Sequence, residues 1–160
     1  MAIVGRNIVA MMTGGALVNT LYGNLEALLM LDSAIRVKFA NEIATPESLP
    51  TQYDNDPTDI SKNGIWCRFT INTSGTAQKS IGTPGANVFR TNGIATAQLF
   101  GPLGVGDADL VDLAEKIETA FRNTYSEGVH FGCPLIKKIG RTDNWWQINV
   151  HCPFYFDVLA

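Results

Sequence analysis

The chain has 160 residues and a formal net charge of −3; 46% of its residues are hydrophobic and only 17% are charged. This length fits one domain that can bury a core without disulfide or metal support. The charge balance argues against affinity built on phosphate neutralisation, which requires a basic face. The charged fraction lies below the roughly 25% of typical soluble proteins, which suits a chain that buries surface against partners.

The three cysteines are odd in number and have no framework spacing, which predicts reduced thiols in the core of a cytoplasmic protein; they are Cys67, Cys133 and Cys152. The apolar run 8–12 is too short for a signal peptide and is interrupted at 13–15. No run approaches the roughly 18 apolar residues of a membrane span. The sequence therefore predicts a soluble protein that is neither exported nor bound to a membrane.

The first quarter of the chain predicts an arm, a helix and a short strand. Residues 1–15 are weakly patterned and are expected to form an arm or a helix start. Leucines at helical spacing predict a helix over 16–31. Apolar residues at 35, 37 and 39 alternate with Arg36 and Lys38, which predicts a strand over 36–40. The proline-rich segment 41–63 has no periodicity and is expected to be a long surface loop.

Two strands are predicted in the middle of the chain. Over 65–71 apolar residues alternate with Trp66, Arg68 and Thr70, which is typical of a half-buried strand. The segment 73–87 is rich in small residues and predicts a second flexible connection. A strand over 89–100 follows, and Gly93 within it indicates a bulge or a close backbone approach.

The glycine-rich turn 101–107 leads into the clearest helix of the sequence. Asp107 is the expected N-cap, and the helix is predicted to run to Tyr125 and to end at Gly128. Its expected buried stripe contains Leu110, Ala114, Ile117, Phe121 and Tyr125. Two ion pairs at spacing i,i+4 are expected on its wet side, Asp112 with Lys116 and Glu118 with Arg122.

The last two predicted strands, 129–139 and 144–156, form a hairpin across the turn 140–143. In the final strand the even-numbered residues 146–156 are expected to face the core. The odd-numbered residues face outward, and this row is expected to end in two exposed aromatic side chains, Trp145 and Tyr155. Rows of this composition are typical of protein interfaces.

These elements predict an α+β fold: a mixed, mainly antiparallel sheet packed against one long helix, at about 107–125, plus an N-terminal helix. We expect a single domain over 16–160. The candidate interface residues are Trp66, Arg68, Trp145, Gln147 and Tyr155, together with the connection 73–87. The basic cluster at 137–141 is a further place where a partner's acidic rim could bind.

Four chemical motifs in the sequence each have a structural explanation as well. The pairs His130/Cys133 and His151/Cys152 supply zinc-type ligands, but neighbours on a strand point to opposite faces, so buried thiols and ordinary histidines are favoured. The glycine turn matches no nucleotide-binding spacing, and the acidic run 54–59 lacks the glycine and glutamate of a calcium loop. No nucleophile elbow is present. The sequence predicts no enzyme activity, catalytic residue, metal or cofactor.

The order of these elements, together with the strand 89–93 (Phe-Arg-Thr-Asn-Gly), the turn 100–106 and the strand 145–150, resembles the tail terminator family of long-tailed bacteriophages. The resemblance covers about residues 16–157. The chain departs from the compact family pattern in its longer N-terminal segment and in the proline-rich segment 45–63.

This resemblance implies a structural virion protein at the head–tail junction. Such a subunit assembles into a hexameric ring, caps the tail tube, stops its elongation and offers its other face to a neck or head-completion protein. Genomic DNA would pass through the ring without specific binding. The alternatives are another head–tail connector of similar size or, from a different class, a small ligand-binding or enzymatic domain that uses the glycine turn and a histidine.

Overall fold

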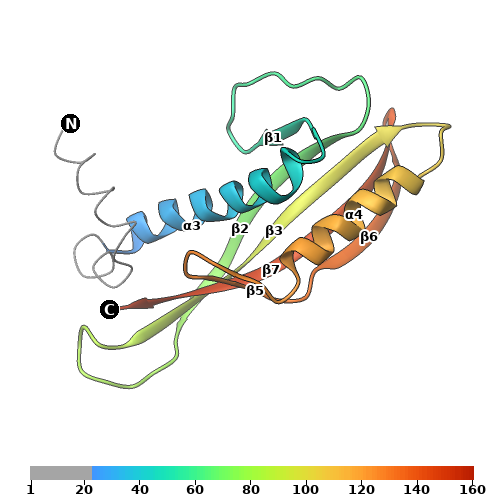
Figure 1. The fold of residues 1–160 in the computed structure, drawn as a ribbon. Helices are drawn as coiled ribbons and strands as arrows, with labels where there is room; N and C mark the ends of the chain where they lie inside the picture. The colour runs from blue at the N-terminus through green and yellow to red at the C-terminus, as the bar shows by residue number, and fades with distance from the viewer. Residues whose placement is uncertain (1–22) are drawn as a thin grey trace.

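The computed structural model describes residues 23–160 of the chain (Figure 1). In chain order the elements are α3 (Gly23–Phe39), the π-helical turn η1 (Ala40–Ala44), β1 (Thr51–Tyr53), β2 (Trp66–Gln78), β3 (Val88–Pro102), α4 (Ala108–Phe121), β4 (Tyr125–Ser126), β5 (Val129–Phe131), β6 (Leu135–Thr142) and β7 (Trp145–Leu159). The predicted arm at 1–15 and the predicted helix start at 16–22 lie outside the described residues. No helix within the described part of the chain is long and apolar enough to cross a bilayer.

The seven strands form one sheet in the order β1-β2-β3-β7-β5-β4, and β6 also pairs with β7. The pair β1–β2 is parallel and every other pair is antiparallel. The prediction of an α+β fold with a mixed, mainly antiparallel sheet is therefore confirmed. Three long strands, β2, β3 and β7, make up most of the sheet (Figure 1).

Both helices pack on the same face of this sheet, and the core lies between the two layers (Figure 1). The pairing aligns buried residues across β2, β3 and β7: Cys67 with Leu99 and Ile148, and Phe69 with Ala97 and Val150. From the helical layer, the ring of Phe39 stacks on Phe69 with 4.2 Å between centroids. This alternation of core and outer residues along each strand confirms the predicted core face of the last strand.

The predicted strand at 36–40 is wrong, because these residues continue α3 into η1. Leu31, Ile35, Phe39 and Ile43 recur every four residues and are all at most 4% exposed. Val37, which a strand would place on the same face as its neighbours at 35 and 39, is 52% exposed. The period of four was the correct signal; the alternation over five residues was too short to overrule it.

The predicted loop at 41–63 is partly structured. After η1, the chain inserts Leu49 into the core and adds β1 to the edge of the sheet. The backbone N–H of Cys67 donates to the carbonyl of Pro50, 2.8 Å away, at the start of this pairing. A three-residue strand that depends on its neighbour for pairing leaves little periodicity in the sequence, so it was missed.

The predicted connection at 73–87 is shorter than expected, because β2 runs to Gln78 and pairs with β3 along an extended hairpin. Only 79–87 connect the two strands. Gly93 confirms the predicted close approach: a Cβ atom there would lie 2.4 Å from Cζ of Phe154 and 2.6 Å from the carbonyl oxygen of Asn72. The register of β2 shifts between Thr73 and Gly75, next to this point.

The helix α4 ends at Phe121, earlier than the predicted Tyr125. Its stripe from Leu110 to Phe121 is buried as predicted, but Tyr125 belongs to β4 and is 64% exposed. Gly128 lies in the turn between β4 and β5 rather than at the helix end. Both expected ion pairs on the wet side are present.

Asp107 occupies the predicted N-cap position, but its side chain does not cap the helix. Its Oδ2 instead accepts a hydrogen bond from Nζ of Lys138, 2.9 Å away, which ties the turn to β6. The turn before it contains Gly104 and Gly106 at φ of 81° and 82°, a region that a side chain disfavours.

The predicted strand at 129–139 is divided into β5 and β6, which lie end to end along the same edge of β7. The backbone leaves the ladder at 132–134, where Pro134 has no N–H to donate. The N–H of Gly132 still donates to the carbonyl of Pro153, 2.9 Å away. The hairpin between β6 and β7 is confirmed, with its turn at 143–144.

Candidate interface on the helix-free face of the sheet

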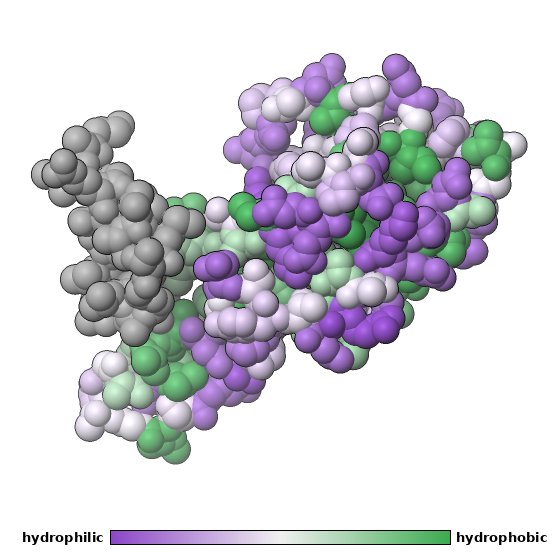
Figure 2. Space-filling model, in the orientation of Figure 1, coloured by the Kyte–Doolittle hydropathy of each residue, from purple (hydrophilic) through white to green (hydrophobic). Residues whose placement is uncertain are grey.

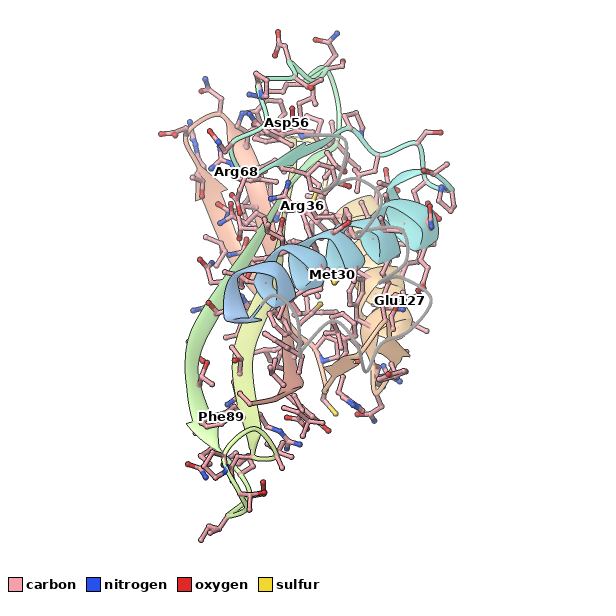
Figure 3. The ribbon with its side chains drawn as sticks, turned by 90° about the vertical axis from the view of Figure 1, so that its left-hand side faces the viewer. Met30, Arg36, Asp56, Arg68, Phe89 and Glu127 are labelled. Carbon is pink, nitrogen blue, oxygen red and sulfur yellow. The ribbon has the colours of Figure 1, made fainter. Side chains whose placement is uncertain are left out.

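The second face of the sheet has no described helix over it, since α3 and α4 both pack on the core face. Figure 3 shows the helices on one side of the sheet, with Arg68 on the other. The pairing places Trp66, Arg68 and Thr70 of β2 on this face, with Gln98 of β3 and Asn149 of β7. We call it the helix-free face.

Three aromatic side chains gather at one end of the helix-free face. The rings of Trp66 and Phe100 stack with 4.3 Å between centroids, and Trp145 meets Trp66 edge-on at 5.8 Å. Trp66 is 4% exposed and Phe100 7% exposed. Two of the residues predicted from sequence, Trp66 and Trp145, are therefore in direct contact in this aromatic cluster.

Two cationic side chains cover the aromatic cluster. The ammonium of Lys62 lies 4.8 Å from the centre of the Trp66 ring, and the guanidinium of Arg68 lies 5.9 Å from it and 6.0 Å from that of Phe100. Cations placed over aromatic faces gain electrostatic attraction and shield apolar surface from water. Within the described residues neither cation forms an ion pair, so both charges remain available to a partner.

Beside the aromatic cluster lies a strip of amide and hydroxyl groups along β3 and β7. Nε2 of Gln147 donates to Oδ1 of Asn149, 2.8 Å away, and both residues are less than 10% exposed. Oγ1 of Thr96 is 3.1 Å from Nδ1 of His151. Because β7 lies between β3 and β6, neighbouring side chains flank this strip on both sides.

Tyr155, the fifth predicted residue, lies far from the aromatic cluster. Ten residues of β7 separate it from Trp145, about 33 Å at the rise of a strand. Its ring stacks on His130 with 4.7 Å between centroids, and Cζ of Arg90 lies 3.9 Å from the centre of the same ring. Arg90 also forms a bidentate ion pair with Asp157 at 2.7 Å, and this hydrogen bonding holds the pKa of the Asp157 carboxyl below its usual value.

The structure thus brings together Trp66, Arg68, Trp145 and Gln147 and leaves Tyr155 at the other end of the same face. The prediction that the outward row ends in exposed aromatics is wrong: Trp145 and Tyr155 are both half-buried. Contact with Trp66 and with Arg90, respectively, covers them. Gln147, predicted as an outward interface residue, is buried.

Sequence patterns missed Thr96 and Gln98, which complete this face; Lys137 was identified only within the basic cluster at 137–141, and Asn149 only as an outward residue of its strand. Each is an ordinary polar residue on a strand, and only the register across four strands aligns them. Alternation along β7 indicated that Asn149 faces outward. No pattern in the sequence specified which residues of β2, β3 and β6 lie beside it.

Two buried indole N–H groups in the described structure have no hydrogen-bond acceptor, those of Trp66 and Trp146. Trp66 belongs to the aromatic cluster, and Trp146 lines a small hollow next to the glycine turn with Pro102, Gly104 and Asp107. Leaving a buried donor unpaired costs about 1–3 kcal/mol.

The prediction of three core thiols holds for two of them. Cys67 and Cys152 are buried, and burial raises the pKa of both thiols, that of Cys152 to about 12. Cys133 is exposed instead, next to Pro134 in the break between β5 and β6. At neutral pH the two buried thiols are therefore protonated and unreactive.

The side chains of the acidic run 54–59 and of the histidine–cysteine pairs have partners within the fold. The acidic run uses Asp54 to accept the backbone N–H of Ile71 and Asp56 to accept that of Thr58. The ring of His130 lies between two tyrosines, whereas Cys152 faces the core. Across residues 23–160 no three His, Cys, Asp or Glu side chains are grouped as metal ligands would be.

Comparisons with known proteins add a fold but no family. No family model matches the chain, and no curated protein matches it. Among solved structures, a protein whose name states no function superposes with a TM-score of 0.51 at 16% sequence identity, covering 79% of this chain and 94% of its own. At this identity the likeness concerns the fold alone.

Proposed function

We propose that this chain is a structural subunit that acts by self-association, as a tail terminator capping the tail tube of a long-tailed bacteriophage. The ring halts elongation of the tube and joins it to a neck or head-completion protein, at the head–tail junction of the virion. The sequence resemblance over residues 16–157 motivates this proposal. The helix-free face is the observation that supports it best: Trp145 is half-buried there beside the buried rings of Trp66 and Phe100, and Lys62 and Arg68 form no ion pair within the described residues.

The composition of the helix-free face suits a protein contact. Interfaces are enriched in Trp, Tyr, Phe and Arg, and their energy is concentrated in a few such anchors. Here Trp66, Phe100, Trp145 and Arg68 form one contiguous group. Trp66 and Phe100 are already buried, so docking would remove water mainly from the half-buried Trp145 and the exposed Arg68, without a large rearrangement.

The direct test is a tube-elongation assay. Purified tail-tube protein is allowed to polymerise with and without the chain, and tube lengths are measured by electron microscopy. A terminator halts growth at substoichiometric amounts and is found at tube ends. Tubes that grow unchanged in its presence would refute the terminator function and favour another head–tail connector.

Trp145→Ala is the first variant to compare in this assay. Removing a hot-spot aromatic costs about 2 kcal/mol or more of binding, roughly thirtyfold in affinity, so ring closure and arrest should weaken together. Tyr125→Ala is the matched control, since it removes an aromatic side chain that is 64% exposed and lies outside the aromatic cluster. Equal activity of both variants and the wild type would exclude Trp145 from the contact.

A further inference from the structure

Charge is segregated between the two layers of this fold. On the helix-free face, the register aligns a row across four strands: Arg68 on β2, Gln98 on β3, Asn149 on β7 and Lys137 on β6. Both cations are exposed, and neither forms an ion pair among the described residues. At about 4.8 Å per strand, they lie roughly 14 Å apart with two amides between them.

The outer side of the helical layer has the opposite sign. The segments 40–48 and 108–122 contain six carboxylates and two cationic side chains, and Lys38 of α3 forms a further ion pair with Glu42. Lys116 pairs with Asp112 one turn earlier on α4 and, across the groove, with Glu47 just after η1. Asp109 and Glu115 are exposed and form no ion pair within the described residues. Figure 2 shows hydrophilic residues gathered over α4 and the C-terminal end of α3.

We propose that the helix-free face of one copy docks on the outer side of the segments 40–48 and 108–122 of the next copy, which we call the α4–η1 face. Arg68 and Lys137 then lie opposite Asp109 and Glu115. This inference rests on the proposed function and names the two patches of the ring contact. Because the patches lie on opposite layers, the contact is heterologous and repeats head to tail, closing into a ring when the rotation allows. Trp145, the half-buried member of the aromatic cluster, supplies apolar area, and the charges orient the copies.

The charges also disfavour the alternative self-contact. Two helix-free faces placed together by a two-fold axis would bring Arg68 and Lys137 close to their own counterparts. Two α4–η1 faces would likewise oppose carboxylates to carboxylates. Like charges across an interface are repulsive, so the head-to-tail arrangement is the one that both faces favour.

A second copy fits this face better than nucleic acid does. The helix-free face offers few free cations, since Arg90 is neutralised by Asp157. Binding to a phosphate backbone requires several cations acting together on a basic surface, and the chain as a whole is negative. An acidic protein surface of matching size is satisfied by two cations and a row of amides.

The test uses two charge-reversed variants of the full chain. In Arg68→Glu/Lys137→Glu both faces are acidic, and in Asp109→Lys/Glu115→Lys both faces are more basic. Self-association is measured by sedimentation velocity at rising concentration. Each variant alone should associate at least tenfold more weakly than the wild type. An equimolar mixture should recover association, because each face then finds a partner of opposite sign in alternating order.

A third variant, Ser33→Glu/Thr58→Glu, controls for a more negative total charge. It adds two carboxylates at exposed positions outside both patches and should associate as the wild type does. Recovery on mixing excludes misfolding as the cause of weak association, because unfolded chains would not restore it. A chain that carries all four substitutions has the charges of its two faces exchanged, so it should self-associate without either double variant.

Several outcomes would overturn the inference. These are a wild type that stays monomeric to about 1 mM, variants that associate normally, or a mixture that fails to recover. Loss of DNA binding in Arg68→Glu/Lys137→Glu, with self-association unchanged, would assign the face to nucleic acid instead. The tube-elongation assay is independent of this test. If the wild-type chain arrests tube growth but its copies meet through another contact, the proposed function is upheld and only this interface is refuted.

Discussion

Gly93 is the position at which the sheet tolerates least change, and Gly93→Ala tests the register on which the helix-free face depends. A methyl group there would lie 2.4 Å from Cζ of Phe154 and 2.6 Å from the carbonyl oxygen of Asn72. The Phe154 ring is 3% exposed, so it has little room to move. The carbonyl belongs to the backbone of the adjacent strand and moves only if the strand moves.

The expected cost follows from these two contacts. Overpacking a core costs about 1–3 kcal/mol, and contact with backbone places this substitution near the upper end. Replacing glycine returns about 0.4–1 kcal/mol through the unfolded chain. The net loss of unfolding free energy is therefore about 2 kcal/mol, which lowers Tm by roughly 4–8 °C for a chain of this size.

Urea unfolding followed by tryptophan fluorescence measures this loss. Gly64→Ala is the control, because a Cβ atom at Gly64 meets nothing within 4 Å, and it should leave stability within about 0.5 kcal/mol of the wild type. Phe154→Leu should partly relieve the clash, so the double variant should lose at least about 0.5 kcal/mol less than the sum of the single losses. If Gly93→Ala unfolds at the same urea concentration as the wild type, Gly93 does not lie as close to Phe154 and to the carbonyl of Asn72 as the structure places it.

Three further predictions concern the helix α3, the ion pair between Arg90 of β3 and Asp157 of β7, and the exposed thiol of Cys133. Ile35→Ala should cost about 2–4 kcal/mol of unfolding free energy and Val37→Ala less than about 0.5, whereas a strand at 36–40 would make the two losses similar. Asp157→Asn should destabilise the protein slightly at pH 7 and not at low pH. The pKa of Asp157 is lowered from 3.8, so its ion pair with Arg90 stabilises the fold at neutral pH and is lost below about pH 4. The denaturation curves of the variant and the wild type should therefore meet below about pH 4. A thiol reagent should label Cys133 in the native protein and the other two cysteines only after denaturation, and uniform labelling would contradict their burial.

The sequence predicted the fold class because long amphipathic elements carry a strong signal. The stripe of α4 and the alternation along β7 both extend over more than ten residues; the alternation was correct, and so was the stripe as far as Phe121. The errors concern short or ambiguous segments. At 35–39 alternation and a four-residue period coexist, and only the continuation to Ile43 distinguishes them.

The candidate site was predicted less completely than the fold, for a physical reason. Alternation along one strand tells which residues share a face, so Trp145 and Gln147 were identified from β7 alone. The neighbours of these residues come from other strands, and their identity depends on register, which pairing and packing determine together. Burial was also misjudged, because Trp66 and Trp145 cover each other only once β2 and β7 are placed on either side of β3.

The strand edges of this sheet bear on how copies associate. Beyond β1, the outer edge of β2 has no strand partner among the described residues, and its ladder is interrupted by the register shift at 73–75 and by the carboxylate of Asp54, which accepts the N–H of Ile71. The outer edge of β6 has adjacent lysines and its own register shift at 138–140. Bulges and charges of this kind oppose edge-to-edge pairing, because a regular ladder cannot extend across them. With the edges protected and the two faces opposite in charge, the faces are where association between copies is expected, and the mixing experiment tests that directly.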